Sequence, residues 1–80
     1  MSTQEAIAIR IIQLCKEMGY TSNGIAVHSA VPQGTLKSIL NGESKNPGIV
    51  TIKKLCDGFG ITLGIFFSSP VFDNLEQEIK

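Results

Sequence analysis

The sequence predicts an all-α domain of five helices, and three observations support this prediction. Apolar residues recur at helical spacing, as at Ile7, Ile11 and Leu14 near the start of the chain. Glycines that favour helix ends follow such segments, as at Gly19 and Gly60. The chain has 80 residues, of which 42% are hydrophobic, and this is enough for one compact core but not for two. We therefore expect a single small helical bundle.

The helix ends follow from capping residues. The first helix should take Thr3 as its N-cap, bury Cys15 and Met18 on its apolar face, and end at Gly19. Further helices should run from Thr21 or Ser22 to Ser29 or Ala30, from a first turn containing Pro32 to Asn41-Gly42, from 49 to 59, and from 63 to 67. Together these segments make up a domain at residues 1–69.

Residues 21–42 have the pattern of a helix-turn-helix, which is two short helices joined by a tight turn. The turn should run through Ala30, Val31 and Pro32. The pattern turns five apolar side chains inward: Ile25, Ala26, Leu36, Ile39 and Leu40. It leaves four polar side chains on the outer face of the second of these helices: Gln33, Thr35, Lys37 and Ser38.

Residues 70–80 form a C-terminal tail. Val71, Leu75 and Ile79 recur every four residues, which predicts a short amphipathic helical extension. The apolar residues that the core does not need predict an interface with a second copy of the chain, at Ile65, Phe67, Val71 and Phe72. The alternative is that the tail folds back over the first helix.

Composition and motifs argue against several classes of function. Cys15 and Cys56 are far apart and lack the spacing of metal ligands, so we expect buried thiols, and His28 should lie in solvent. No catalytic cluster or phosphate-binding glycine loop is evident, so we expect neither an enzyme nor a metal, a cofactor or a small-molecule ligand. The chain lacks a secretory signal and an apolar run that could span a membrane, which predicts a cytoplasmic protein.

The net charge is zero, but the charges are unevenly distributed. Residues 20–54 contain four lysines and one glutamate, whereas residues 71–80 contain three acidic residues and one lysine. A basic surface with an acidic tail is compatible with nucleic acid on one side of the molecule.

The order and spacing of these residues resemble the Cro and lambda-repressor type of helix-turn-helix domain, also called the xenobiotic-response-element type, over residues 9–67. The matching residues are Met18-Gly19-Tyr20-Thr21, Ile25-Ala26, Val31, Thr35-Leu36, Asn41-Gly42, Pro47, Ile49, Thr51-Ile52, the segment from Leu55 to Leu63, and Phe66.

The resemblance implies a lambda-repressor-like bundle that binds double-stranded DNA with its third helix in the major groove. It implies base contacts by Gln33, Gly34, Lys37 and Ser38, and phosphate contacts by Ser22, Thr35, Asn41 and Lys45. The Gln33 amide suits adenine, whereas Gly34 offers only close approach of the backbone.

The chain departs from the family pattern at three places. Cys15 and Leu40 stand where many members have an Arg and a Glu, so an apolar contact replaces an ion pair. Pro32 replaces the usual hydroxyl cap of the third helix, and Gly24 replaces an acidic residue of the second. These changes affect local stability and helix entry rather than the fold.

Two functions are therefore weighed. The favoured one is a small sequence-specific transcriptional regulator that binds DNA as a homodimer. The alternative is a protein-interaction module, such as the antitoxin-like partner of a toxin, with secondary DNA binding. Zero net charge, Gly34 and the acidic tail favour this alternative.

Overall fold

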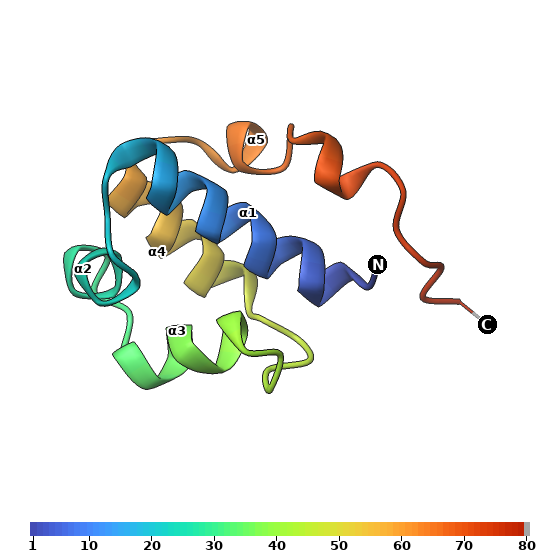
Figure 1. Ribbon diagram of the computed structural model, residues 1–80, viewed down its shortest axis with the longest axis horizontal. Coiled ribbons are helices and arrows are strands. Elements are labelled where there is room, and N and C mark those ends of the chain that lie inside the picture. The colour runs from blue at the N-terminus through green and yellow to red at the C-terminus, as the bar shows by residue number, and fades with distance from the viewer. Residues whose placement is uncertain (80) are drawn as a thin grey trace.

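The computed structural model describes residues 1–79, and within them the chain forms five α-helices and one 3₁₀ helix (Figure 1). The elements are α1 (Thr3–Met18), α2 (Ser22–His28), α3 (Gln33–Leu40), α4 (Ile49–Phe59), α5 (Leu63–Phe66) and the 3₁₀ helix η1 (Pro70–Phe72). The prediction of a five-helix, all-α bundle is confirmed. No helix of the described residues is both long and apolar enough to cross a membrane.

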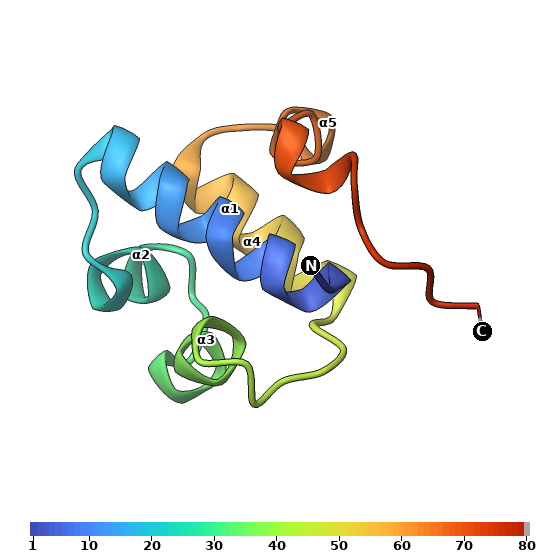
Figure 2. The ribbon, with the colours of Figure 1, turned by 45° about the vertical axis from the view of Figure 1, so that its right-hand side comes forward.

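The core is enclosed by the five helices, of which α1 and α4 run side by side through the molecule (Figures 1 and 2). Its largest fully buried side chains come from all five helices: Phe66, Ile11, Leu14, Ile25, Leu36, Ile39, Leu55 and Cys56. Burying one such aliphatic or aromatic side chain contributes about 1.5–3 kcal/mol. Met18, expected in the core, is instead 40% exposed, because it lies in the last turn of α1 beyond the packed helices.

Both cysteines are buried and free of disulfides, as the sequence predicts. Burial raises the pKa of the Cys15 thiol and of the Cys56 thiol. Both thiols therefore remain protonated at neutral pH and act as small apolar core residues.

The helix ends agree with the sequence in most places and differ in two. Thr21 and Thr62 cap α2 and α5 with their hydroxyls, which accept from Gly24 N at 2.9 Å and from Ile65 N at 3.1 Å. The N-cap of α1, however, is Ser2 rather than Thr3. Pro32 is the N-cap of α3 and not a residue of its first turn, because its backbone is still extended at ψ 136°.

Ser2 caps α1 through a reciprocal pair of hydrogen bonds with Glu5. Ser2 Oγ accepts from Glu5 N at 3.3 Å, and the Glu5 carboxylate accepts from Ser2 N at 3.2 Å. Hydrogen bonding to the Ser2 side chain, and then to its backbone, holds the pKa of Glu5 below its ordinary value. A capping box therefore fixes the start of α1, which explains why Thr3 is already helical.

Arg10 connects α1 to α5, which the sequence did not predict. Its side chain is buried, with 9% of the residue exposed. Nε donates to the Phe66 carbonyl at 2.7 Å, and Nη2 donates to the Ile65 carbonyl at 2.9 Å. The positive charge of a guanidinium interacts favourably with the partial negative charge at the C-terminal end of a helix. Arg10 therefore satisfies the last carbonyls of α5 and fixes that short helix on the bundle.

The short helical extension expected in the tail is present, but only as a single turn. The tail forms one 3₁₀ turn at Pro70–Phe72, and no helix follows in residues 73–79. Phe72 packs on Phe66 and Phe67, with ring centroids 6.0 and 5.0 Å away. A single turn is enough to bring Phe72 against both rings. Ile79, further along the tail, is 89% exposed. The last residue of the predicted tail, Lys80, lies outside the described residues.

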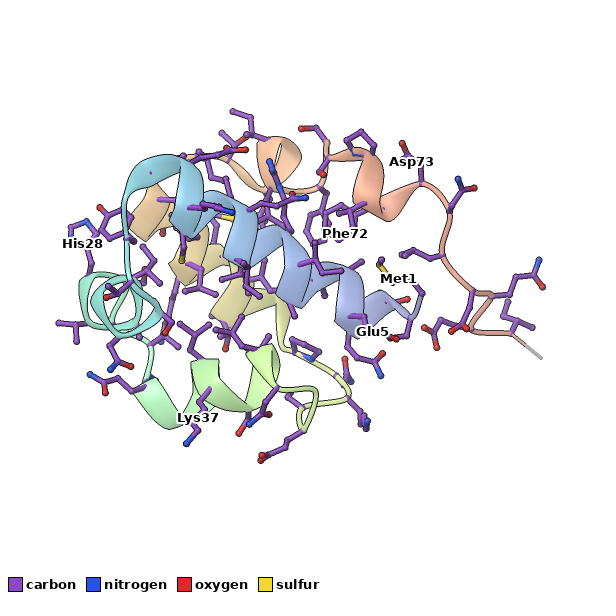
Figure 3. The ribbon with its side chains drawn as sticks, in the orientation of Figure 1. Met1, Glu5, His28, Lys37, Phe72 and Asp73 are labelled. Carbon is purple, nitrogen blue, oxygen red and sulfur yellow. The ribbon has the colours of Figure 1, made fainter. Side chains whose placement is uncertain are left out.

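Beyond η1 the tail returns to the start of α1. Glu76 N donates to the Met1 carbonyl at 3.0 Å, and Thr3 Oγ1 donates to the Glu78 carboxylate at 2.7 Å. Figure 3 shows Phe72 and Asp73 on the side of the molecule where Met1 and Glu5 begin α1. The structure thus matches the alternative in which the tail folds back over the first helix.

Candidate nucleic-acid interface

A tight turn joins α2 and α3 on one side of the α1–α4 pair (Figure 2). Ser29 N donates to the Ile25 carbonyl at 2.9 Å, and Val31 N donates to the Ala26 carbonyl at 2.9 Å. Ala30, between them, has a φ of 55°, which is the left-handed region that non-glycine residues rarely adopt. Val31 is buried with 4% of its surface exposed, which anchors the turn in the core. The expected helix-turn-helix is therefore present, with its turn at Ala30 and Val31.

Close contact with α4 fixes the position of α2. A Cβ added at Gly58 would lie 1.9 Å from Ser29 Oγ and 2.9 Å from Ser29 Cβ. Ser29 Oγ is itself buried and has no hydrogen-bond partner within residues 1–79. Only a glycine lets the two helices approach this closely, so Gly58 sets the orientation of the helix-turn-helix on the bundle.

The inner and outer sides of α3 differ in their exposure to solvent. Leu36 and Ile39 are 1% and 2% exposed and hold the helix on the core. The residues expected to contact bases lie on the outer side, where Gln33, Gly34 and Lys37 are exposed and Ser38 is half-buried. Figure 3 shows the Lys37 side chain pointing away from the rest of the molecule. The fold thus presents all four residues together on one helix.

An open groove of about 480 Å³ runs between the first turn of α2 and the outer side of α3. Its lining residues are Ser22, Asn23, Gln33, Gly34, Leu36, Lys37 and Leu40. The groove brings Ser22, expected to contact phosphate, beside three of the residues expected to contact bases. Sequence reasoning missed Asn23, although its place beside Ser22 at the exposed start of α2 was a usable signal.

Of the other residues expected to contact phosphate, none lines the groove between α2 and α3. Thr35 is exposed in the first turn of α3. Asn41 Nδ2 donates to the Glu43 carboxylate at 2.9 Å, and Asn41 Oδ1 accepts from Glu43 N at 3.2 Å. The Asn41 side chain therefore closes the turn that follows α3.

Lys45 lies in the loop between α3 and α4 and lines a second groove, of about 440 Å³. This groove also includes Thr3 from the start of α1, Ile49, Phe67 and Glu78 from the tail. The structure thus brings Lys45 next to the chain ends, apart from the residues that surround the groove between α2 and α3.

The residues expected at a dimer interface fall into two pairs. Ile65 and Phe67 are 50% and 38% exposed, whereas Val71 and Phe72 are half-buried. Sequence reasoning missed two exposed neighbours at the start of α4, Ile49 and Val50, which are 58% and 66% exposed. Their apolar side chains side by side at a helix start could have revealed them. Ile49 and Phe67 line the same groove, so the start of α4 and the end of α5 share an apolar surface there.

Comparisons with known proteins agree with this geometry. A family model described as "Cro/C1-type HTH DNA-binding domain" matches residues 10–67. The crystal structure of the prophage Lp1 protein 11 is similar, with a TM-score of 0.81 and 30% sequence identity, over 94% of this chain and 100% of that chain. No curated protein matches. The resemblance expected over residues 9–67 is confirmed.

Proposed function

The chain belongs to the Cro/C1-type helix-turn-helix DNA-binding family, and on this premise we propose that it is a small sequence-specific transcriptional regulator. In this proposal α3 enters the major groove of double-stranded DNA, and Gln33, Gly34, Lys37 and Ser38 face the base edges. The observation that carries the proposal is the outer side of α3, where Gln33, Thr35 and Lys37 are exposed and lie outside the hydrophobic core that holds the bundle together.

Gln33 is the principal base-contacting residue in this account. Its amide carries one donor and one acceptor, which match the N7 and N6 groups of adenine in the major groove. It is exposed at the first position of α3, the helix end that such domains bring to the bases. Lys37, one turn further along the same side of the groove, can reach either a base or a phosphate.

Phosphate contacts are assigned to Ser22, Thr35 and Lys45, which are all exposed. Ser22 and Thr35 lie in the first turns of α2 and α3, where backbone N–H groups are free to face an anion. Asn41, whose side chain is held by Glu43, contributes by shaping the turn that leads to Lys45. These groups position the protein on the duplex without discriminating between sequences.

Dimerisation is part of the proposal, because one short recognition helix makes few contacts and a two-fold dimer doubles them across adjacent half-sites. The proposed interface is the exposed apolar surface of Ile65 and Phe67, extended by Ile49. It includes Phe72, which packs on Phe67, and the half-buried Val71 beside it in the chain. Ile49→Glu should shift the sedimentation mass at micromolar concentration toward the monomer. The matched control is Val27→Glu, an exposed apolar residue on α2. A wild-type monomer under these conditions would contradict the dimer.

Salt dependence of binding to random duplex DNA tests the proposal. The logarithm of the affinity should fall linearly with the logarithm of the salt concentration, because bound lysines release counterions from the phosphates. Lys37→Ala and Lys45→Ala should each reduce that slope by about one. Lys16→Ala is the control, since Lys16 is exposed on α1 and has no assigned contact. If the wild-type chain does not bind duplex at about 50 mM salt, the proposal fails.

The second candidate is a protein-interaction module with secondary DNA binding. Zero net charge and the acidic residues of the tail, which lie against the start of α1 near Lys45, favour it. The same titration separates the two functions. An interaction module should bind duplex weakly, with a slope that Lys37→Ala and Lys45→Ala leave unchanged.

A further inference from the structure

Gly34 is a glycine that the fold does not require. Its backbone is not in the left-handed region, unlike that of Gly19, Gly42 and Gly60. A Cβ added at Gly34 would meet no atom of residues 1–79 within 4 Å apart from its chain neighbours and the backbone of α3. Alanine is also the better helix former. Neither backbone conformation, nor packing, nor helix propensity accounts for a glycine here, so the reason has to lie outside the folded chain.

Gly34 also occupies a distinctive position on α3. Successive residues of an α-helix are 100° apart around its axis. The direction opposite the midpoint of the buried Leu36 and Ile39 therefore falls close to Gly34, with Lys37 and Ser38 on either side. Gly34 therefore lies at the middle of the outer side of α3, where it leaves a gap between the side chains of Lys37 and Ser38.

The chemistry of the exposed backbone limits what can contact it. Backbone N–H and C=O groups of a helix point along its axis, and the free N–H of Gly34 in the first turn points toward the start of α3. The surface that Gly34 presents sideways, away from the core, therefore consists of Cα hydrogens and is apolar. Among the groups on base edges in the major groove, the 5-methyl group of thymine is the apolar one. The groove beside Gly34 leaves the approach open.

We propose that Gly34 is a specificity-determining residue, at which the bare backbone of α3 packs against the 5-methyl group of a thymine. This inference rests on the proposed function of DNA binding. The contact at Gly34 selects thymine because its 5-methyl group fills the space that a side chain would otherwise occupy. It also lets α3 approach the bases more closely than an alanine would allow, which brings the neighbouring Gln33 amide within reach of its base.

The test begins with duplexes selected by the wild-type chain from a random pool. Each thymine of the selected site is then replaced, one at a time, by deoxyuridine, which lacks only the 5-methyl group. At one position in each half-site this change should weaken wild-type binding about fourfold, the factor expected for one buried methyl group. Binding should be measured in parallel with Gly34→Ala and with Gly64→Ala.

Gly64 provides the matched control, because it is also the second residue of its helix, α5, and an added Cβ there meets only Thr62 Oγ1, at 3.7 Å. Both alanine variants should fold at least as stably as the wild type by urea denaturation. Gly34→Ala should bind the thymine site at least fourfold more weakly. It should also lose or reverse the preference for thymine, because removing the base methyl makes room for the alanine methyl. Gly64→Ala should behave as the wild type does.

The outcomes separate this inference from the proposed function. If the wild-type chain selects no duplex at all, the proposed function fails and this inference fails with it. If a duplex is selected but no thymine methyl affects binding, or if Gly34→Ala keeps the wild-type preference, the inference is overturned while DNA binding stands. If Gly34→Ala weakens binding without any dependence on the methyl group, the assignment to thymine is overturned.

Discussion

Two glycines of this domain have opposite surroundings. At Gly58, α4 approaches α2 so closely that a Cβ would lie 1.9 Å from Ser29 Oγ. At Gly34, on the outer side of α3, a Cβ would meet no atom of residues 1–79 within 4 Å apart from its chain neighbours and the backbone of α3. The first glycine is required by internal packing, whereas no contact within residues 1–79 requires the second. The contrast distinguishes the scaffold, which holds the helix-turn-helix in place, from the surface proposed to contact DNA.

Substitution of Arg10 should cause the largest loss of stability. Arg10→Met removes two buried hydrogen bonds from a charged donor and leaves the Phe66 carbonyl without its partner. Since such bonds contribute about 1.5–3 kcal/mol each, we expect the free energy of unfolding to fall by about 3 kcal/mol. The measurement is urea denaturation, with Lys16→Met as the control that removes an exposed charge from the same helix. Equal stability of the two variants would show that Arg10 does not hold α5.

Substitution of Gly58 should have the next largest effect. Gly58→Ala forces a side chain into the contact with Ser29, and overpacking of this kind costs about 1–3 kcal/mol. In a Ser29→Ala background the closest obstacle is gone, so the loss should be smaller. Ser29→Ala alone should be neutral or stabilising, because it removes a buried hydroxyl that has no partner in residues 1–79. If Gly58→Ala is as stable as the wild type, the helices are not held as closely as described.

Substitution of Ala30 by glycine, in the turn between α2 and α3, should change the free energy of unfolding by a smaller amount and in the opposite direction. Ala30 has a φ of 55°, which costs an alanine about 1–2 kcal/mol but a glycine nothing. A glycine also has more freedom to lose on folding, so Ala30→Gly should raise the free energy of unfolding by about 0.5–1 kcal/mol. Ala30→Val should lower it, since β-branched residues tolerate this region poorly. Thermal denaturation checks both signs, and a destabilised Ala30→Gly would contradict the strained turn.

Local patterns predicted most of the fold. Four helices ended within a residue of their expected bounds, because their apolar spacing, threonine caps and terminal glycines are all encoded nearby, as at Thr21, Gly19 and Gly60. The role of Arg10 was not visible, since its partners are carbonyls 55 and 56 residues away that any sequence would supply. The length of the helical extension in the tail was mispredicted for a related reason. Three apolar residues at helical spacing were outweighed by packing of Phe72 on Phe66 and Phe67 and by hydrogen bonds to Met1 and Thr3.

The part of the candidate site that lies on a single helix, α3, could be predicted from the sequence. The resemblance to a known family placed the proposed base contacts on α3, and the structure presents them on its outer side. Contacts between elements were harder to predict. The neighbourhood of Asn23 and Gln33, the hydrogen bonds from Asn41 to Glu43, and the apolar surface shared by Ile49 and Phe67 all depend on how separate segments meet.

The central claim is that the outer side of α3 serves a DNA partner and not the fold, and Gln33→Ala tests it most directly. Its free energy of unfolding and its affinity for the selected duplex should be measured on the same sample. We expect stability to change by no more than about 0.5 kcal/mol, since Gln33 is exposed and outside the core. Binding should weaken by about 1–3 kcal/mol, with discrimination lost at one base pair. Unchanged affinity, or a loss of binding matched by a loss of stability, would contradict the account.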